Sequence, residues 1–457
     1  MPQHNDSAVS KSETEAANRV VNGSAVEQGV VDSVSELPAA LAGHRIGIII
    51  SMFPELHETF ILRELVALER KGLAFTIYSL QHPRDPITME DAIRLSENRT
   101  RYSSLITPAT LGAFAKTALT RPVRVASAVF KLLRHGYDRP TDVVKALAIL
   151  PITLYFEQQA RAEGITHFHG HWANIPTTAC WFLHQIYDYS WSAAIHGEDI
   201  FSPNQFLAYK LEDARFAAVC SGLFCRHIQT ELNLTRPHDV HLNYHGLDPK
   251  VMALSADKVF RQRTDGEPVR LISIGRMVPT KGHDTLIKAC ADLVRQGVAV
   301  TLELIGSGPI ESELKQLTEA QGLSDHVEFR GGIAFDEVLE ALQRADIFCL
   351  APRMLPGQPP DGIPNVIAEA MALRIPVVTT RVSAIPELIE DGVSGLLVPV
   401  DDVDAMASAI ASVVNDETFA RALSDRGFQK VGTLFDQNKN IDELLDLFSQ
   451  YLDKAPS

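Results

Sequence analysis

Short apolar runs alternate with longer amphipathic stretches along most of the chain. In the first half this pattern predicts a helix over 55–70 and strands near 45–50, 73–80, 165–168, 191–195, 216–220 and 239–244. In the second half it predicts strands near residues 270, 301, 327, 347, 376 and 395, each followed by a helix. Alternating strands and helices are typical of parallel, doubly wound α/β sheets. We therefore expect two such sheets.

Breaks in this alternation suggest the domain limits. Residues 1–44 contain six acidic and two basic side chains and no sustained periodicity, which predicts a disordered tail. The alternation then predicts a first domain over 45–250 and, after a polar linker, a second domain over 265–435.

Composition narrows the class of protein. Of 457 residues, 46% are hydrophobic and 22% are charged, which suffices for two buried cores. The five cysteines include no Cys-x-x-Cys pair, so we expect buried thiols in a reducing cytoplasm. The first residues do not have the pattern of a secretory signal, and no apolar stretch is long enough to span a bilayer. A net charge of −15 argues against nucleic acid as a partner.

The charge is distributed unevenly. Residues 99–145 contain nine Lys or Arg against two Asp, a local balance of +7, together with apolar side chains such as Phe114, Val129 and Phe130. We expect a basic helical insert here, and two interpretations stay open. The insert could dock on an anionic membrane surface, or it could be a solvated basic face over packed helices.

Two carboxylates flank a predicted helix entry in the second half. The stretch reads Asp361-Gly362-Ile363-Pro364-Asn365-Val366-Ile367-Ala368-Glu369. Pro364 suits a first helical turn, and Gly362 lets a ligand approach the backbone. The following amides are then available to an anion, and Glu369 could reach a vicinal diol. The alternative is an ordinary loop entering a helix with Glu369 in solvent.

Two other strand exits in the second half suit a diphosphate. One reads Gly275-Arg276-Met277-Val278-Pro279-Thr280-Lys281-Gly282, and the other reads Gly306-Ser307-Gly308-Pro309. Ligands of parallel sheets bind outside the carboxyl ends of the strands, so we expect Arg276 and Lys281 at one anion site. The second exit lacks the third glycine of the dinucleotide fingerprint.

Histidines mark strand exits in the first half. His169 and His171 flank Gly170 at one exit, and His196 follows the next strand. The i, i+2 spacing would suit metal ligands, but the sequence offers no third ligand nearby. This favours an acceptor-side or structural role for the pair and no metal site.

Two further polar groups lie at strand exits and leave alternatives open. Asp199 could orient His196 or cap the next helix. Glu58 and Thr59 follow the first strand, and Thr59 could cap the helix that begins there.

Together these motifs resemble the retaining glycosyltransferases of family 4, which have the two-Rossmann-domain (GT-B) architecture, and in particular the exopolysaccharide and colanic-acid branch. The resemblance covers roughly residues 45–440. In the first half it rests on Ser51-Met52-Phe53-Pro54-Glu55-Leu56-His57-Glu58-Thr59-Phe60-Ile61, His167-Phe168-His169-Gly170-His171 and Ala194-Ile195-His196-Gly197-Glu198-Asp199. It implies that residues 436–457 form a helix that crosses back to the first domain.

The resemblance also implies an activity: transfer of a hexose-type sugar, with retention of configuration, from a nucleotide-diphosphate sugar to a glycan or lipid-linked acceptor. The enzyme would be cytoplasmic or peripheral to the inner face of the cell membrane, and no metal is expected. Arg276 and Lys281 would stabilise the leaving diphosphate, and Glu369 would hold the ribose.

The remaining implied roles divide between donor and acceptor. His196 and Asp361 would contact the donor sugar, although the family usually has Glu where this chain has Asp361. The implied acceptor-side residues are Glu58, Thr59, His169, His171 and Asp199.

Other functions stay open from the sequence. A nucleotide-sugar epimerase could use the same scaffold, and a transferase could act on a small-molecule acceptor. A non-catalytic sugar-nucleotide binder is a third alternative, because fold alone does not determine function.

Overall fold

The computed structural model describes residues 37–55, 58–84, 89–201, 206–255, 264, 266–356, 358 and 362–452. Within these residues the strands form two parallel sheets, with the orders β3-β2-β1-β4-β5-β6-β7 and β10-β9-β8-β11-β12-β13. The prediction of two doubly wound α/β sheets is confirmed.

The first sheet is built from strands that lie close to their expected places. Its strands are β1 (Ile46–Met52), β2 (Phe75–Gln81), β3 (Thr100–Tyr102), β4 (His167–His171), β5 (Ser190–Ile195), β6 (Ala217–Val219) and β7 (Val240–Leu242). Its helices are α1 (Thr59–Arg70), α2 (Glu90–Arg99), α3 (Pro108–Thr120), α4 (Pro122–His135), α5 (Pro140–Ala148), α6 (Leu150–Ala162), α7 (Ile175–Tyr187), α8 (Gly197–Phe201), α9 (Phe206–Leu211), α10 (Gly222–Glu231) and α11 (Pro249–Ala253).

The second sheet follows the same plan. Its strands are β8 (Val269–Ile274), β9 (Val300–Ile305), β10 (Val327–Gly331), β11 (Ile347–Leu350), β12 (Val377–Thr380) and β13 (Leu396–Val398). The helices that follow β8 along the chain are α12 (His283–Arg295), α13 (Glu311–Ala320), α14 (Phe335–Arg344), α15 (Asn365–Ala372), α16 (Ile385–Leu388), α17 (Val403–Asn415), α18 (Glu417–Leu434) and α19 (Gln437–Leu452).

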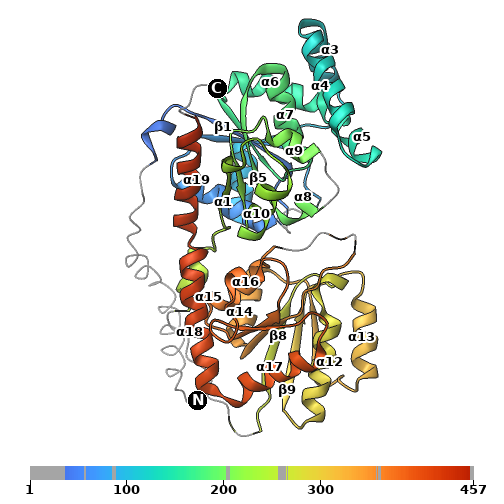
Figure 1. The fold of residues 1–457 in the computed structure, drawn as a ribbon, viewed down its shortest axis with the longest axis vertical. Helices are drawn as coiled ribbons and strands as arrows, with labels where there is room; N and C mark the ends of the chain where they lie inside the picture. The colour runs from blue at the N-terminus through green and yellow to red at the C-terminus, as the bar shows by residue number, and fades with distance from the viewer. Residues whose placement is uncertain are drawn as a thin grey trace, which may run out of the picture. The chain divides into compact units, whose positions relative to one another are not determined.

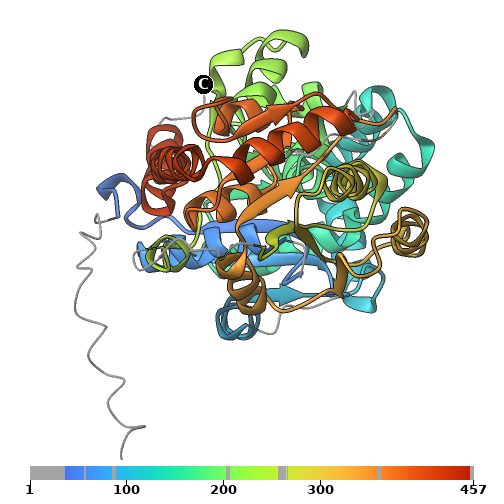
Figure 2. The same ribbon diagram turned by 90° about the horizontal axis from the view of Figure 1, so that it is seen from below.

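Each sheet has an apolar core on both faces, and helices cover both faces (Figures 1 and 2). In β1, Ile49 belongs to one core while Ile48 and Ile50 belong to the other. In β11, Cys349 and Phe348 are divided between two cores in the same way. Because successive side chains of a strand point to opposite faces, strands covered on both sides are apolar throughout, which is why these runs could be recognised in the sequence.

The strand order of each sheet reverses at one point. In the first sheet β1 lies between β2 and β4, and in the second β8 lies between β9 and β11. The chain therefore leaves neighbouring strands toward opposite faces at β1/β4 and at β8/β11. In doubly wound sheets, ligands bind at such a point, outside the carboxyl ends of the strands.

Three expectations about the first half need correction. Helix α1 begins at Thr59 rather than near 55, because Glu55 belongs to the loop after β1, where its carboxylate accepts a bond of 2.5 Å from the backbone of Arg84. The segment expected to be a helical insert from 99 begins with strand β3, which pairs with Ile77–Ser79 of β2 at the sheet edge. Regular structure also begins before residue 44, because Ala39–Leu41 form a short 3-10 helix with Leu41 buried; the rest of the expected tail, residues 1–36, lies outside the described residues.

The last helix, α19, packs on the first sheet. Its residues Ile441, Leu444 and Phe448 share a core with β1 and α1. Asp442 on α19 pairs with Lys71 at 2.7 Å. None of the helices in the described ranges is both long and apolar enough to cross a bilayer.

Candidate active site at the carboxyl ends of the strands

The glycine-rich exits of β8 and β9 lie in backbone contact. The amide of Gly275 donates to the carbonyl of Ile305 at 2.9 Å, and the amide of Met277 donates to that of Ser307 at 2.8 Å. A Cβ atom on Gly306, whose φ is +131°, would lie 2.1 Å from the carbonyl oxygen of Gly275, and one on Gly308 would lie 2.3 Å from that of Met277. These glycines permit two strand exits to pack against each other with little side-chain bulk between them.

The end of this first exit also packs against β11. Gly282 has φ +66°, and a Cβ atom there would lie 1.8 Å from the carbonyl oxygen of Ala351, directly after β11. Lys281 ends the short 3-10 helix Pro279–Lys281 and is half-buried, whereas Arg276 is exposed. The structure thus brings Gly275, Arg276, Lys281, Gly306 and Gly308 to the switch point of the second sheet.

His283, the first residue of α12, lies beneath these loops. Its Nδ1 atom is 3.4 Å from the hydroxyl of Ser273, and its Nε2 atom would be 3.8 Å from a Cβ atom on Gly275. Burial, together with the nearby charge of Lys281, lowers the pKa of His283 to about 4. The imidazole is therefore neutral at physiological pH.

Glu369 is buried rather than solvated. It lies on α15, whose N-cap residue is Pro364, and it is 7% exposed. Its Oε1 atom lies 3.3 Å from Nη1 of Arg63 on α1. The interpretation of this stretch as a loop with a solvated Glu369 is therefore wrong.

The residues around the start of α15 differ in how deeply they are buried. Pro364 is buried, and Ile363 and Asn365 are half-buried. A Cβ atom on Gly362 would lie 3.2 Å from the ring of Phe224 on α10, so this glycine gives the loop room beside that ring. Asp361 lies outside the described residues.

His196 follows β5 and lies within a group of aromatic rings. Its Nδ1 atom is 3.1 Å from Nε2 of His245, and its ring centroid is 4.5 Å from that of Trp172 and 5.1 Å from that of Phe60. Burial holds the pKa of His196 well below its usual value of 6.5, and the neighbouring His245 lowers it further. Neutral His196 can accept or donate one hydrogen bond at each ring nitrogen.

Asp199 holds the backbone around His196. Its Oδ2 atom accepts bonds from the amide of Ala173 at 2.7 Å and from that of His196 at 3.2 Å. The carboxylate therefore joins the exit of β4 to the exit of β5. Of the two roles left open from the sequence, positioning of His196 is the one that these bonds support, through the backbone rather than the ring.

His169 and His171 have a third ligand-type residue beside them. Together with Glu64 of α1, they form a buried group whose potential ligand atoms all lie within 4.8 Å of one another. The sequence argument that no third ligand lies nearby is therefore wrong, because a helix distant in sequence supplies it.

The expected acceptor-side residues Glu58 and Thr59 lie at the beginning of α1. Glu58 is the N-cap residue and Thr59 is the first residue of the helix. Thr59 therefore does not cap α1 as the sequence suggested. Both residues precede Arg63 and Glu64 on the same helix.

Sequence reasoning missed Arg63, Glu64 and His245. A signal existed for Glu64, because it is i+3 from Ile61 and i+4 from Phe60, on the apolar face of α1. A carboxylate on the core face of a helix requires a partner. His245 carries no such signal, because it follows a short strand without a recognisable motif.

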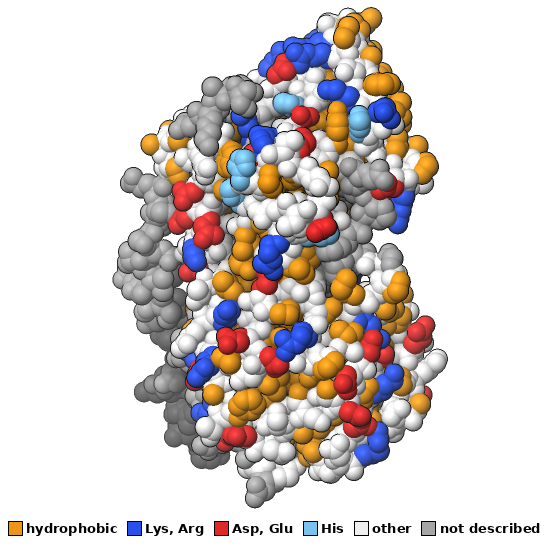
Figure 3. All heavy atoms as spheres, in the orientation of Figure 1, with side chains coloured by type: hydrophobic (Ala, Val, Ile, Leu, Met, Phe, Trp, Pro, Cys, Tyr) orange, Lys and Arg blue, Asp and Glu red, His pale blue; other side chains and the backbone are white. Residues whose placement is uncertain are grey.

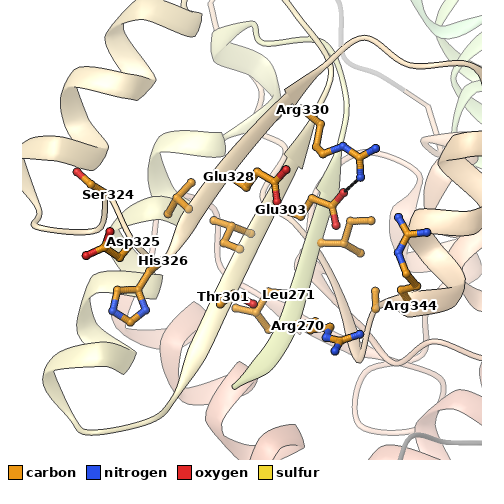
Figure 4. Close-up of a pocket in the computed structure, with 14 residues that line it drawn as sticks. Arg270, Leu271, Thr301, Glu303, Ser324, Asp325, His326, Glu328, Arg330 and Arg344 are labelled. Carbon is orange, nitrogen blue, oxygen red and sulfur yellow. Dashed lines mark hydrogen bonds and ion pairs between the residues drawn. The ribbon is translucent and has the colours of Figure 1, made fainter. Parts of the chain in front are cut away.

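One cavity of the second sheet lies away from these loops (Figure 4). It measures about 540 Å³ and is lined by residues from β8, β9, β10 and α14. Glu303 and Arg330 in its lining pair with each other at 2.8 Å. Its lining extends to Arg270 and Thr301, at the beginnings of β8 and β9, so we do not regard it as the site of the glycine loops.

Comparison with known proteins agrees with this arrangement. The model of the family described as glycosyl transferases group 1 matches residues 256–430. The chain is 38% identical over 188 residues to the putative colanic acid biosynthesis glycosyltransferase WcaL of Salmonella typhimurium, a match that covers 40% of this chain and 46% of that protein. It is 33% identical over 163 residues to a GDP-mannose-dependent alpha-(1-6)-phosphatidylinositol monomannoside mannosyltransferase of Mycobacterium tuberculosis. This match covers 35% of this chain and 42% of that protein. The chain thus spans about half the length of the curated relatives it matches.

Solved structures extend the likeness to both sheets. Anabaena HepE in complex with UDP superposes with a TM-score of 0.62 at 16% identity. The superposition covers 89% of this chain and 100% of the HepE chain. At this identity the likeness concerns the fold. Residues 256–430 are therefore similar to group 1 glycosyltransferases, and the two parallel sheets have the GT-B fold of the solved structures.

Proposed function

We propose that the protein is a retaining glycosyltransferase that moves a hexose-type sugar from a nucleotide-diphosphate sugar to a glycan or lipid-linked acceptor in cell-surface polysaccharide synthesis. One observation carries the proposal. The glycine loops, Arg276 and Lys281 meet at the switch point of the second sheet, within the residues that the family model matches.

The second domain would bind the donor. Glycines at 275, 306 and 308 would let the diphosphate approach the backbone, and Arg276 and Lys281 would meet the charge that grows on it as the sugar leaves. Glu369 would accept bonds from the ribose, with Arg63 orienting its carboxylate at 3.3 Å. Asp361 would contact the donor sugar. HepE was solved in complex with UDP, and the mycobacterial relative is described as GDP-mannose-dependent, so nucleotides of both kinds are candidates.

The first domain would bind the acceptor. His196 would lie near the reacting carbon, held by Asp199 through its backbone and by His245 at 3.1 Å. Glu58 and Thr59, at the start of α1, would contact the acceptor. The group of His169 and His171 would form the floor of this side of the site.

The basic insert would hold the enzyme at a membrane that carries a lipid-linked acceptor. Several apolar side chains of α3 and α4 are exposed, among them Leu119 at 82% and Phe130 at 65%. Hydrophobic and basic side chains lie next to each other over these helices, at the upper right of Figure 3. Apolar side chains beside cations suit an anionic lipid surface.

A panel of nucleotide sugars tests the proposal. The correct donor should raise the melting temperature, because a ligand at about 100 times its dissociation constant stabilises by about 2.7 kcal/mol. The stabilising nucleotide sugar is then incubated with glycan and lipid-linked acceptors, and the products are separated. Transfer with retention supports the proposal. Isomerisation of the sugar without transfer would identify an epimerase, and binding without either reaction would identify a non-catalytic binder.

A further inference from the structure

Metal-ligand side chains gather at the carboxyl ends of the first sheet. One group consists of Glu64 on α1 with His169 and His171 on β4, and all three side chains are buried. A second group, His196, Cys220 and His245, lies close to it and shares a cavity of about 10 Å³ with Glu64 and His169. A cavity of this size holds about one water molecule or one ion.

Within the first group, ring nitrogens lack the hydrogen bonds that buried polar atoms need. Among the residues that the structure describes, Nε2 of His169 and both ring nitrogens of His171 have no hydrogen-bond partner. A buried polar atom without a partner is unfavourable unless something binds it. His169, which is 1% exposed, lines the cavity, so a ring with one unpartnered nitrogen forms part of the cavity wall.

The spacing of the group suits a cation. Nε2 of His171 lies 3.2 Å from Oε1 of Glu64. Two ligands about 2.1 Å from a tetrahedral ion lie about 3.4 Å apart, so these atoms could bind one ion with little movement. Metal-bound histidines usually bond through their other nitrogen to a fixed group, and Nδ1 of His169 lies 2.7 Å from the hydroxyl of Ser192.

We propose that Glu64, His169 and His171 bind one divalent transition-metal ion of the zinc class. Two imidazoles and a carboxylate form a ligand set typical of zinc, with a fourth position open to the cavity beside His196 and His245. The ion would join α1 to β4, two elements distant in sequence, at the switch point of the first sheet. The test of this site is independent of the proposed sugar transfer, because bound metal is measured without donor or acceptor.

Metal analysis of the untagged full chain tests the site. After loading with zinc and exhaustive dialysis, the wild-type protein should retain about one equivalent of zinc. Chelator should remove the metal and lower the melting temperature, and readdition of zinc should restore it. Replacing zinc with cobalt should give the visible absorption bands of tetrahedral Co²⁺ with nitrogen and oxygen ligands.

Variants assign the ligands. Glu64→Gln and His169→Gln should each lose the retained equivalent and the cobalt bands. The matched control is His283→Gln, because His283 is also buried but begins α12 in the second half of the chain. The control should keep the metal. A wild-type protein with only background metal would overturn the proposal, since a water molecule would then fill the cavity. Full retention by both ligand variants would overturn it as well, because the ion would then lie elsewhere.

Discussion

The contact between Glu369 and Arg63 joins two residues far apart in sequence and buries both side chains. Removing the carboxylate leaves the guanidinium of Arg63 without this partner and, if the proposed function holds, leaves the ribose hydroxyls unpaired. We expect Glu369→Ala to weaken donor binding by about 1–3 kcal/mol, or roughly 5- to 150-fold in dissociation constant. Calorimetric titration of the nucleotide sugar measures the change.

Stability must be separated from binding in this variant. Glu369→Gln keeps the volume of the side chain, and Glu417→Ala removes a carboxylate from the exposed start of α18. The first should bind the donor weakly while melting near the wild-type temperature, and the second should bind normally. Donor affinity unchanged in Glu369→Ala would show that this carboxylate does not touch the nucleotide.

Arg276 and Lys281 are predicted to act in the transition state more than in binding. Each alanine variant should reduce turnover about 100-fold at saturating donor while changing the donor KM much less, because the charge they meet grows as the diphosphate leaves. Lys288→Ala on α12, whose ammonium lies 3.7 Å from Asp284, is the matched control. Near-normal turnover in both variants would exclude the assigned role.

At the scale of residues, the sequence indicated the motif positions but not their partners. Gly306 and Gly308 could be recognised because a glycine-rich segment directly after an apolar run can be read from the sequence alone. The pairing of Glu369 with Arg63 could not, since the two are 306 positions apart. Only the fold brings α1 next to α15 and Glu64 next to His171.

At the scale of elements, a buried histidine, His283, begins α12. The folded pKa of His283 is about 4 and its ordinary value is 6.5, so between these values the unfolded chain binds more protons than the folded one. The stability that neutral His283 contributes is complete above pH 6.5 and declines as the pH falls toward 4. The loss is on the order of 3 kcal/mol.

Denaturant unfolding of the wild type and of His283→Gln between pH 4 and 7 measures this loss of stability. The charged groups facing His283 are Lys281 and Asp284, and the variant keeps both. The difference in unfolding free energy between the two proteins should shrink as the pH falls, in favour of the variant. A constant difference across this range contradicts the assignment.

The loop between β4 and α7 is held by a buried lysine. The ammonium of Lys210 on α9 donates to the carbonyl of Ala173 at 2.8 Å, to that of Asn174 at 3.0 Å and to the hydroxyl of Thr177 at 3.0 Å. Lys210→Met should lower the free energy of unfolding by about 3 kcal/mol or more, because these buried acceptors lose their donor. Lys116→Met on the exposed face of α3 should change it by less than about 0.5 kcal/mol. Equal stability of the two variants in urea would refute the role.

Most elements could be predicted because strands covered on both faces are continuous apolar runs. Strand β3 was missed because three residues, Thr100–Tyr102, are too few to show a period, and their place depends on pairing with β2. The start of α1 was placed too early because the side chain of Glu55 bonds to a loop that the local sequence does not reveal.

At the scale of the whole molecule, exposed apolar side chains on α3 and α4 predict binding to anionic vesicles. Arg124 pairs with Asp188 at 2.6 Å and Lys131 bonds to Gln185 at 2.6 Å, so part of the local positive charge is already engaged. We therefore expect Phe130→Ser combined with Leu119→Ser to reduce co-sedimentation more than Arg124→Gln does. Each exposed cation lost should weaken binding by about 1 kcal/mol.

Leu254→Ser is the control for this surface, because Leu254 is also exposed but lies after α11. Binding should rise with the anionic lipid fraction and fall with salt. If lipid charge and salt leave the bound fraction unchanged, or if the two serine replacements do, the basic insert is a solvated face.

The packing of α19 on the first sheet has a consequence for the order of folding during synthesis. Phe448 contacts Phe216 with ring centroids 5.4 Å apart, and Ile441 and Leu444 fill the core beside β1. While the ribosome is still making the second half, this apolar face of the first half stays uncovered, because α19 is synthesised after the whole second sheet. Exposed faces of this kind favour aggregation and recruit chaperones. A chain released from the ribosome at about residue 436 would lack α19, and this apolar face of the first half would stay exposed.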